Sequence, residues 1–163
     1  MKKISLVIAG VAVLGVTYWL VSPLFITRTV NEEVPMENPD AGENASQEGI
    51  SEVQQEIPVS VVSQGTFMGK AGHSASGTAR IIETDGKKYV RFESDFKVTN
   101  GPDLFVHFGK DGEYSASAQL GALKGNEGSQ NYEITSDIDP ADFDEVWVWC
   151  RAFSVPFGVA ELE

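Results

Sequence analysis

Cysteine, histidine and basic residues are all scarce in this sequence of 163 residues. The only cysteine is Cys150, so the chain cannot form a disulfide within itself, and one thiol cannot build a structural zinc site. Asp and Glu number 24 against 12 Lys and Arg, which gives a net charge of -12 at pH 7. A chain this acidic repels a phosphate backbone, so we expect no nucleic-acid partner.

Charge is absent altogether from residues 4–26. This run of 23 residues exceeds the roughly 20 that a membrane-spanning helix needs, and Lys2 and Lys3 precede it. We therefore expect residues 1–30 to be an uncleaved signal-anchor with one transmembrane helix. The positive-inside rule then makes the chain a single-pass protein of the cell membrane with its C-terminal domain extracytoplasmic. A cleaved signal peptide is the alternative, but the apolar run is too long for an ordinary h-region.

Aromatic and basic residues are missing from residues 31–58, which carry eight of the acidic residues. Glu, Asn, Pro, Gly and Ser dominate this segment. Such a composition cannot bury enough apolar surface to offset the conformational entropy that is lost on ordering. We therefore expect residues 31–58 to form a disordered acidic tether, extended by repulsion between its charges.

Residues 59–163 carry the strand and turn signals of one globular domain. An Asp-Gly pair at residues 85–86, between two runs rich in β-formers, predicts a hairpin with a two-residue turn. The expected strands cover residues 78–82, 88–92, 104–108, 131–134, 146–150 and 157–162. No helical period of useful length occurs, so we predict an all-β fold, an antiparallel β-sandwich.

Cys150 ends the strand sequence VWVWC. Alternation along a strand places Val146, Val148 and Cys150 on one face, and Trp147 and Trp149 on the other. Cysteine is among the residues most often buried, so a small core residue is one interpretation. A reactive thiol is the other, because an oxidising compartment disfavours an idle, exposed and unpaired cysteine. The residues by themselves leave both interpretations open.

Known motifs of catalysis and metal binding are missing from the sequence. It has no nucleophile elbow, no P-loop, no EF-hand pattern and no C-x-x-C-H haem motif. His73, His107, Cys150 and Met68 provide the ligand types of a blue-copper site, but cupredoxins place His and Met ligands shortly after the cysteine, and none follows here. We therefore assign no metal, leave the cofactor unknown, and keep His107 and His73 as the candidate cofactor ligands. Any enzymatic role would be redox chemistry rather than hydrolysis.

A series of short sequence blocks over residues 65–163 carries a resemblance to a known family. They are Gly65-Thr66-Phe67, Gly77, Phe96, Gly101-Pro102-Asp103-Leu104, Leu120-Gly121-Ala122-Leu123-Lys124-Gly125, Gly128, Gln130, Tyr132, Val148-Trp149-Cys150, Phe153-Ser154-Val155, Phe157-Gly158 and Ala160. In this order they resemble the DM13 domain, also called the electron-transfer DM13 domain. The resemblance implies a small β-rich extracytoplasmic module, which bacteria carry alone behind a membrane anchor. It also implies a redox role, proposed for the family from a cysteine at the position of Cys150.

Two functions follow as expectations. The first is a membrane-anchored, extracytoplasmic electron-transfer module that uses Cys150 and an unidentified redox partner. It requires Cys150 to be reachable or to lie beside a pocket of cofactor size. The second is a cell-envelope binding or adhesion module in which Cys150 is inert and aromatic residues such as Trp147 and Phe105 make the contacts.

Overall fold

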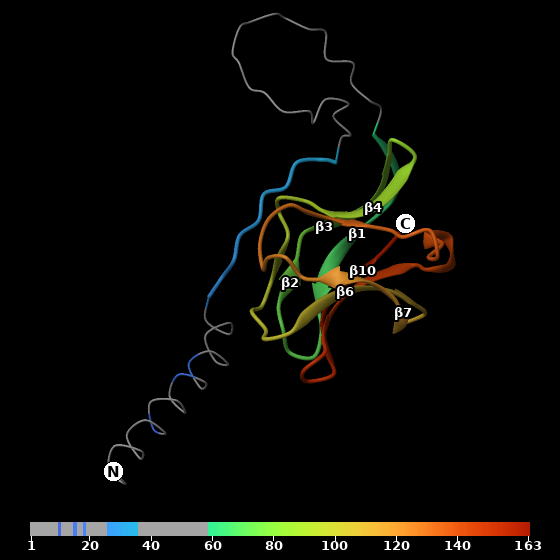
Figure 1. The fold of residues 1–163 in the computed structure, drawn as a ribbon. Coiled ribbons are helices and arrows are strands. Elements are labelled where there is room, and N and C mark those ends of the chain that lie inside the picture. The colour runs from blue at the N-terminus through green and yellow to red at the C-terminus, as the bar shows by residue number, and fades with distance from the viewer. Residues whose placement is uncertain (1–9, 11–14, 16–17, 19–25, 36–58) are drawn as a thin grey trace, which may run out of the picture.

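The computed structural model describes residues 26–35 and 59–163, together with Gly10, Gly15 and Tyr18 (Figure 1). Nearly all of the predicted membrane span, residues 4–26, lies outside the described residues, as do residues 36–58 of the predicted tether. No helix within the described part of the chain is long and apolar enough to cross a membrane.

Ten strands and one 3-10 turn make up the domain. They are β1 (Ser60–Gly69), β2 (Ala75–Ser76), β3 (Thr78–Thr84), β4 (Lys87–Phe92), β5 (Lys97–Val98), β6 (Leu104–Lys110), β7 (Glu113–Ala122), β8 (Gln130–Glu133), η2 (Pro140–Asp142), β9 (Glu145–Cys150) and β10 (Val155–Glu161). Eight strands form one sheet in the order β7-β6-β9-β10-β1-β3-β4-β8, and β2 pairs with β5. The expected all-β, antiparallel class is confirmed.

The arrangement of the strands differs from the predicted sandwich. One continuous sheet curls until it is nearly closed, and its end strands β7 and β8 approach each other (Figure 1). Irregularities interrupt the register of the pairs β1–β3, β9–β10 and β6–β7. Such bulges bend a strand and increase its twist, which allows a single sheet to wrap around a core.

The predicted hairpin is confirmed as β3 and β4, which pair from Ala79 with Phe92 to Thr84 with Lys87. Asp85 and Gly86 both have positive φ, at 51° and 72°. A two-residue turn with both φ angles positive matches the right-handed twist of the flanking strands. Local turn chemistry therefore fixes this register.

The strands expected around residues 104–108, 131–134, 146–150 and 157–162 are also present, as β6, β8, β9 and β10. Strands β1 and β7 were not predicted, although each has ten residues. β1 is rich in Ser, Val and Gly, β7 is rich in Ala and Ser, and most of their side chains are partly or fully exposed. Their pairing partners, rather than their own composition, hold them in the sheet.

Phenylalanine rings fill the centre of the curled sheet. Phe67, Phe92 and Phe96 meet with ring centroids 4.5 to 5.0 Å apart. Phe108, Val106, Val146 and Val148 are fully buried beside them. The inner face of β9 belongs to this core.

Residues 26–35, which we call the strap, lie along the outside of the domain (Figure 1). The main-chain N–H groups of Val30 and Glu32 donate to the carbonyl oxygens of Glu127 and Ser129, each at 2.9 Å. The strap includes residues 31–35 of the segment predicted as a disordered tether. Main-chain hydrogen bonds hold these residues on the domain and need no apolar side chains.

Candidate functional site

Cys150 lies inside the domain with no exposed surface. It pairs with Leu104 of β6 and with Val155 of β10, near one end of β9. Val146 and Val148 share its face and are equally buried, so the predicted alternation along β9 is confirmed. A thiol closed off in this way cannot meet a protein partner or a small oxidant while the domain stays folded.

The opposite face of β9 carries Trp147 and Trp149, which join rings from β6 and β7. We call this cluster the aromatic face, and it consists of Phe105, His107, Tyr114, Trp147 and Trp149. Tyr114 stacks on Trp149 with centroids 4.0 Å apart and planes 18° from parallel. Trp147 lies 6.4 Å from each of these two rings. Ring contacts therefore run from partly exposed Trp149 to buried Trp147.

The indole of Trp147 is held by groups on both sides. Its Nε1–H donates to Oε2 of Glu145 at 2.9 Å, and both residues are 7 % exposed. A side chain at Gly109 would collide with this indole, so β6 needs glycine there. The main-chain N–H of Gly112 donates to the same carboxylate oxygen at 3.2 Å. This hydrogen bonding fixes the orientation of the ring.

His107 belongs to the aromatic face and is 5 % exposed. Its Nδ1–H donates to the carbonyl oxygen of Ser115 at 3.1 Å, and its ring meets Tyr114 edge to face at 5.3 Å. Burial lowers the pKa of His107, and the hydrogen bond to Ser115 opposes this only in part. His107 is therefore a neutral imidazole at pH 7, with Nε2 free of a proton.

Arg151 and Asp103 form the rim of the aromatic face. The guanidinium makes two hydrogen bonds to the carboxylate, at 2.9 and 3.2 Å. It also lies 4.3 Å from the centre of the Phe105 ring, as in a cation–π contact. Asp103 comes from the Gly-Pro-Asp turn that precedes β6, so this sequence block places a charge beside the aromatic rings.

The three candidate ligands from the sequence do not form one site. His73 stacks on Phe157 at 3.6 Å, His107 is on the outer side of β6, and Cys150 is in the core. No group of three or more His, Cys, Asp or Glu in the described part of the chain could hold a metal ion. Two surface depressions, one along β1, β3 and β10 and one around residues 133–140, are lined by other residues.

Sequence reasoning did not find Tyr114 or the grouping of the aromatic face. Trp147 and Trp149 were placed correctly, but Tyr114 is the only aromatic residue of the otherwise small and polar strand β7. Pairing of β6 with β7 and β9 brings these rings together. Contacts of this kind depend on the strand order, which a single sequence does not reveal.

A family model described as "Electron transfer DM13" matches residues 66–162, more than half of the chain. The chain belongs to the DM13 family. The match confirms the family resemblance and spans Cys150 and the whole aromatic face, whereas the strap lies outside it. Comparisons with curated proteins and with solved structures gave no match. The family description points to a redox role for the domain.

Proposed function

We propose that this DM13 protein is an electron-transfer module that residues 4–26 anchor in the cell membrane, with its domain outside the cytoplasm. The family match supports the electron-transfer role. The uncharged run after Lys2 and Lys3 supports the anchor and its orientation. The partner would be a redox protein of the same compartment, and no cofactor of the chain itself is assigned.

The aromatic face supports a route by which electrons could enter and leave. Indole and phenol rings can each give up one electron to a strong one-electron oxidant, such as a high-potential metal or haem centre of a partner protein. A tyrosine also releases its phenolic proton, which water accepts at partly exposed Tyr114. The stacked pair of Tyr114 and Trp149, 4.0 Å apart, is the observation that carries this proposal. Buried Trp147 extends the route inward.

Cys150 keeps a place in this proposal as a redox thiol, but not as a group that meets the partner. Its zero exposure excludes thiol–disulfide exchange in the folded domain, because that reaction needs direct contact between sulfur atoms. An electron exchanged by Cys150 could pass along β9 to the preceding residue, Trp149, which belongs to the aromatic face. Opening of the ends of β9 and β10 is the other way to reach the thiol.

Flash oxidation of the full chain in detergent tests the proposed route. A photogenerated ruthenium(III) polypyridyl complex is the one-electron oxidant, and transient absorption follows the tryptophan and tyrosyl radicals. We expect Tyr114→Phe and Trp149→Phe to change the radical yield severalfold. Tyr89→Phe on β4, which removes a phenol outside the aromatic face, is the matched control and should have little effect. Equal effects of Tyr114→Phe and Tyr89→Phe would refute the aromatic route.

A binding module with an inert Cys150 is the second candidate function. The burial of Cys150 among valines favours it, and partly exposed Phe105, Tyr114 and Trp149 would then be contacts for a ligand. Cys150→Ala tests whether the thiol takes part in electron transfer, while the flash-oxidation experiment separates electron transfer from binding alone. An unchanged rate of electron exchange with the redox partner would remove the thiol from the mechanism, and loss of that exchange with folding intact would establish it.

A further inference from the structure

The strap runs parallel to residues 126–129 and forms an isolated β-bridge with them. Thr29 forms a parallel bridge with Glu127, and the flanking hydrogen bonds link Val30 to Glu127 and Glu32 to Ser129. The N–H of Asn126 donates to the carbonyl oxygen of Arg28 at 2.8 Å. The arrangement resembles the addition of an extended peptide to a sheet edge, in which main-chain hydrogen bonds give affinity and side-chain pockets give specificity.

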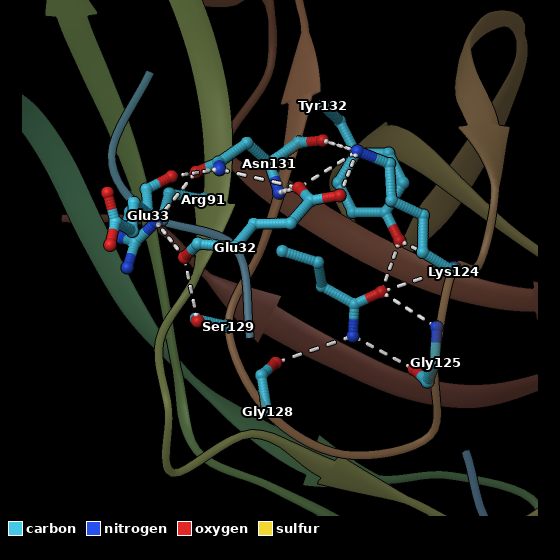
Figure 2. Close-up of polar contacts among 10 residues, drawn as sticks. Glu32, Glu33, Arg91, Lys124, Gly125, Gly128, Ser129, Asn131 and Tyr132 are labelled. Atoms are coloured by element: carbon cyan, nitrogen blue, oxygen red, sulfur yellow. Dashed lines mark hydrogen bonds and ion pairs between the residues drawn. The ribbon is translucent and has the colours of Figure 1, made fainter. Parts of the chain in front are cut away.

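One side-chain pocket takes the carboxylate of Glu32 (Figure 2). The ammonium group of Lys124 contacts both carboxylate oxygens, at 2.8 and 2.9 Å, and the main-chain N–H of Asn131 donates to one of them at 2.7 Å. The carbonyl oxygen of Glu32 accepts from Ser129 Oγ at 2.9 Å and from Arg91 at 3.3 Å. Asn131 Nδ2 donates to the carbonyl oxygen of Glu33 at 2.7 Å. We call Arg91, Lys124, Ser129 and Asn131 the carboxylate pocket.

The domain itself holds the pocket in shape. Gln130 is fully buried, and its Oε1 accepts from the main-chain N–H groups of Lys124 and Gly125 at 3.2 and 3.1 Å. Lys124 Nζ donates to the carbonyl oxygen of Asn131 at 2.7 Å, and Arg91 donates to Asn131 Oδ1 at 2.8 Å. None of these contacts involves the strap. We therefore infer that the pocket keeps its shape without the strap, which lowers the entropic cost of binding Glu32.

Two glycines allow the strap to approach the domain closely. A side chain at Gly128 would collide with the carbonyl oxygen of Val30, and one at Gly125 would lie 2.7 Å from the carbonyl oxygen of Arg28. Gly128 also has a positive φ of 90°, which disfavours other residues. A larger residue at either position would therefore push the strap away.

We propose that residues 28–33 are a releasable latch that sets how far the domain stands from the membrane. The proposal rests on the proposed membrane anchor. With the latch bound, contact with the domain begins at Thr27, whose hydroxyl accepts from Asn100, so the domain follows directly after the predicted span. With the latch released, residues 27–58 would separate membrane and domain. A chain of 32 residues can span at most roughly 110 Å.

The chemistry of the pocket defines what could open the latch. A competitor must be an extended peptide that places one carboxylate between Lys124 and the main-chain N–H of Asn131. Glu32 of the same chain is the occupant that the structure shows. Release would extend the reach of the proposed electron-transfer domain toward a partner further from the lipid surface.

Hydrogen exchange of the full chain in lipid nanodiscs tests the latch itself. Glu32→Gln removes the charge from the pocket. Glu33→Gln is the matched control, because it changes the same charge on a neighbouring residue whose side chain is exposed. We expect the amides of Val30 and Glu32 to exchange about tenfold faster in Glu32→Gln, the order expected from one charge-assisted hydrogen bond. The control should stay within about twofold of the unaltered protein.

Energy transfer to a lipid-borne acceptor tests the consequence for reach. A dye on Lys87→Cys, at the exposed start of β4, reports the distance from the membrane. We expect lower transfer in Glu32→Gln than in Glu33→Gln. Unchanged exchange in Glu32→Gln would overturn the latch, and unchanged transfer despite faster exchange would overturn its role in reach. Failure of the unaltered chain to co-sediment with vesicles would instead refute the anchor. Hydrogen exchange would still show whether the strap binds the domain through Glu32.

Discussion

The aromatic face and the carboxylate pocket lie on one domain but are held together by different forces. Stacked and edge-to-face rings hold the aromatic face, together with the hydrogen bond that Trp147 donates to Glu145. Charges and main-chain hydrogen bonds to Glu32 hold the pocket and the strap. The first kind of contact is insensitive to salt and the second is weakened by it, because ions screen charges that are partly exposed. The domain thus combines a surface of packed rings with a strap contact that salt should weaken.

The largest effect on stability is expected from a substitution in the aromatic face. Trp147→Ala removes a buried indole and should lower the free energy of unfolding by about 3–5 kcal/mol, as measured by urea denaturation of the full chain in detergent. The loss should be the same in high salt, since the contacts of the Trp147 side chain are with rings and a buried carboxylate rather than with the exposed Arg151–Asp103 ion pair. Trp147→Phe keeps a ring without the donor to Glu145 and should lose less. A loss that shrinks in salt would contradict the proposed contrast between the two regions.

The second prediction concerns Gln130, the buried residue that supports the carboxylate pocket. Gln130→Ala removes the acceptor of the buried main-chain N–H of Gly125 and of the Tyr132 hydroxyl, and it leaves the N–H of Lys124 with only the Tyr132 oxygen. We expect the free energy of unfolding to fall by about 2–4 kcal/mol, together with faster hydrogen exchange in the strap. Gln119→Ala, at an exposed position of β7, is the control and should change neither quantity. A stable variant with an ordered strap would show that the pocket does not need Gln130.

The third prediction sharpens the contrast between the two faces of β9. Cys150→Ser places a hydroxyl among buried apolar groups and should lower the free energy of unfolding by roughly 1–3 kcal/mol, more than Cys150→Ala. In the unaltered protein, we expect thiol reagents to label Cys150 only at the rate of opening, so that urea accelerates labelling. Fast labelling without urea would show that the thiol is reachable in the native state.

The smallest expected effect is a pH dependence of the strap. Burial raises the pKa of Glu32, but the hydrogen bonds from Lys124 and Asn131 outweigh it, and the net pKa lies below the ordinary value. A lowered pKa stabilises the docked strap fully above about pH 4.5, and this stabilisation is lost as pH falls through the lowered value. We expect roughly 1 kcal/mol, because Glu32 is partly exposed.

The other polar groups that face Glu32 should not obscure this titration. Lys124 and Arg91 are the cations beside Glu32, and Glu93 pairs with Nε of Arg91 and with Arg80 rather than with Glu32. Burial raises the pKa of Tyr132, so its hydroxyl remains neutral. Amide exchange in the strap, corrected for the intrinsic effect of pH, provides the measurement. The strap of Glu32→Gln should show no such pH dependence, and a profile equal to that of the unaltered protein would assign the titration to another group.

Local patterns in the sequence predicted much of the fold. The Asp85-Gly86 turn specified a hairpin, because few residue pairs tolerate two positive φ angles. Alternation along VWVWC placed Cys150 and both tryptophans on opposite faces, because successive side chains of a strand point to opposite faces. These features depend on residues that are close neighbours in the chain.

Only the tertiary structure decided how the strands and the strap come together. One curled sheet forms in place of the expected sandwich, because bulges and strand order act over the whole chain. Tyr114 meets Trp149 only because β6 lies between their strands. Glu32 finds its pocket at Asn131, 99 residues further along the chain, although its own segment has the composition of a disordered tether. Composition reports what a segment can bury, whereas a preformed pocket elsewhere in the chain can bind even a polar segment through main-chain hydrogen bonds and one carboxylate.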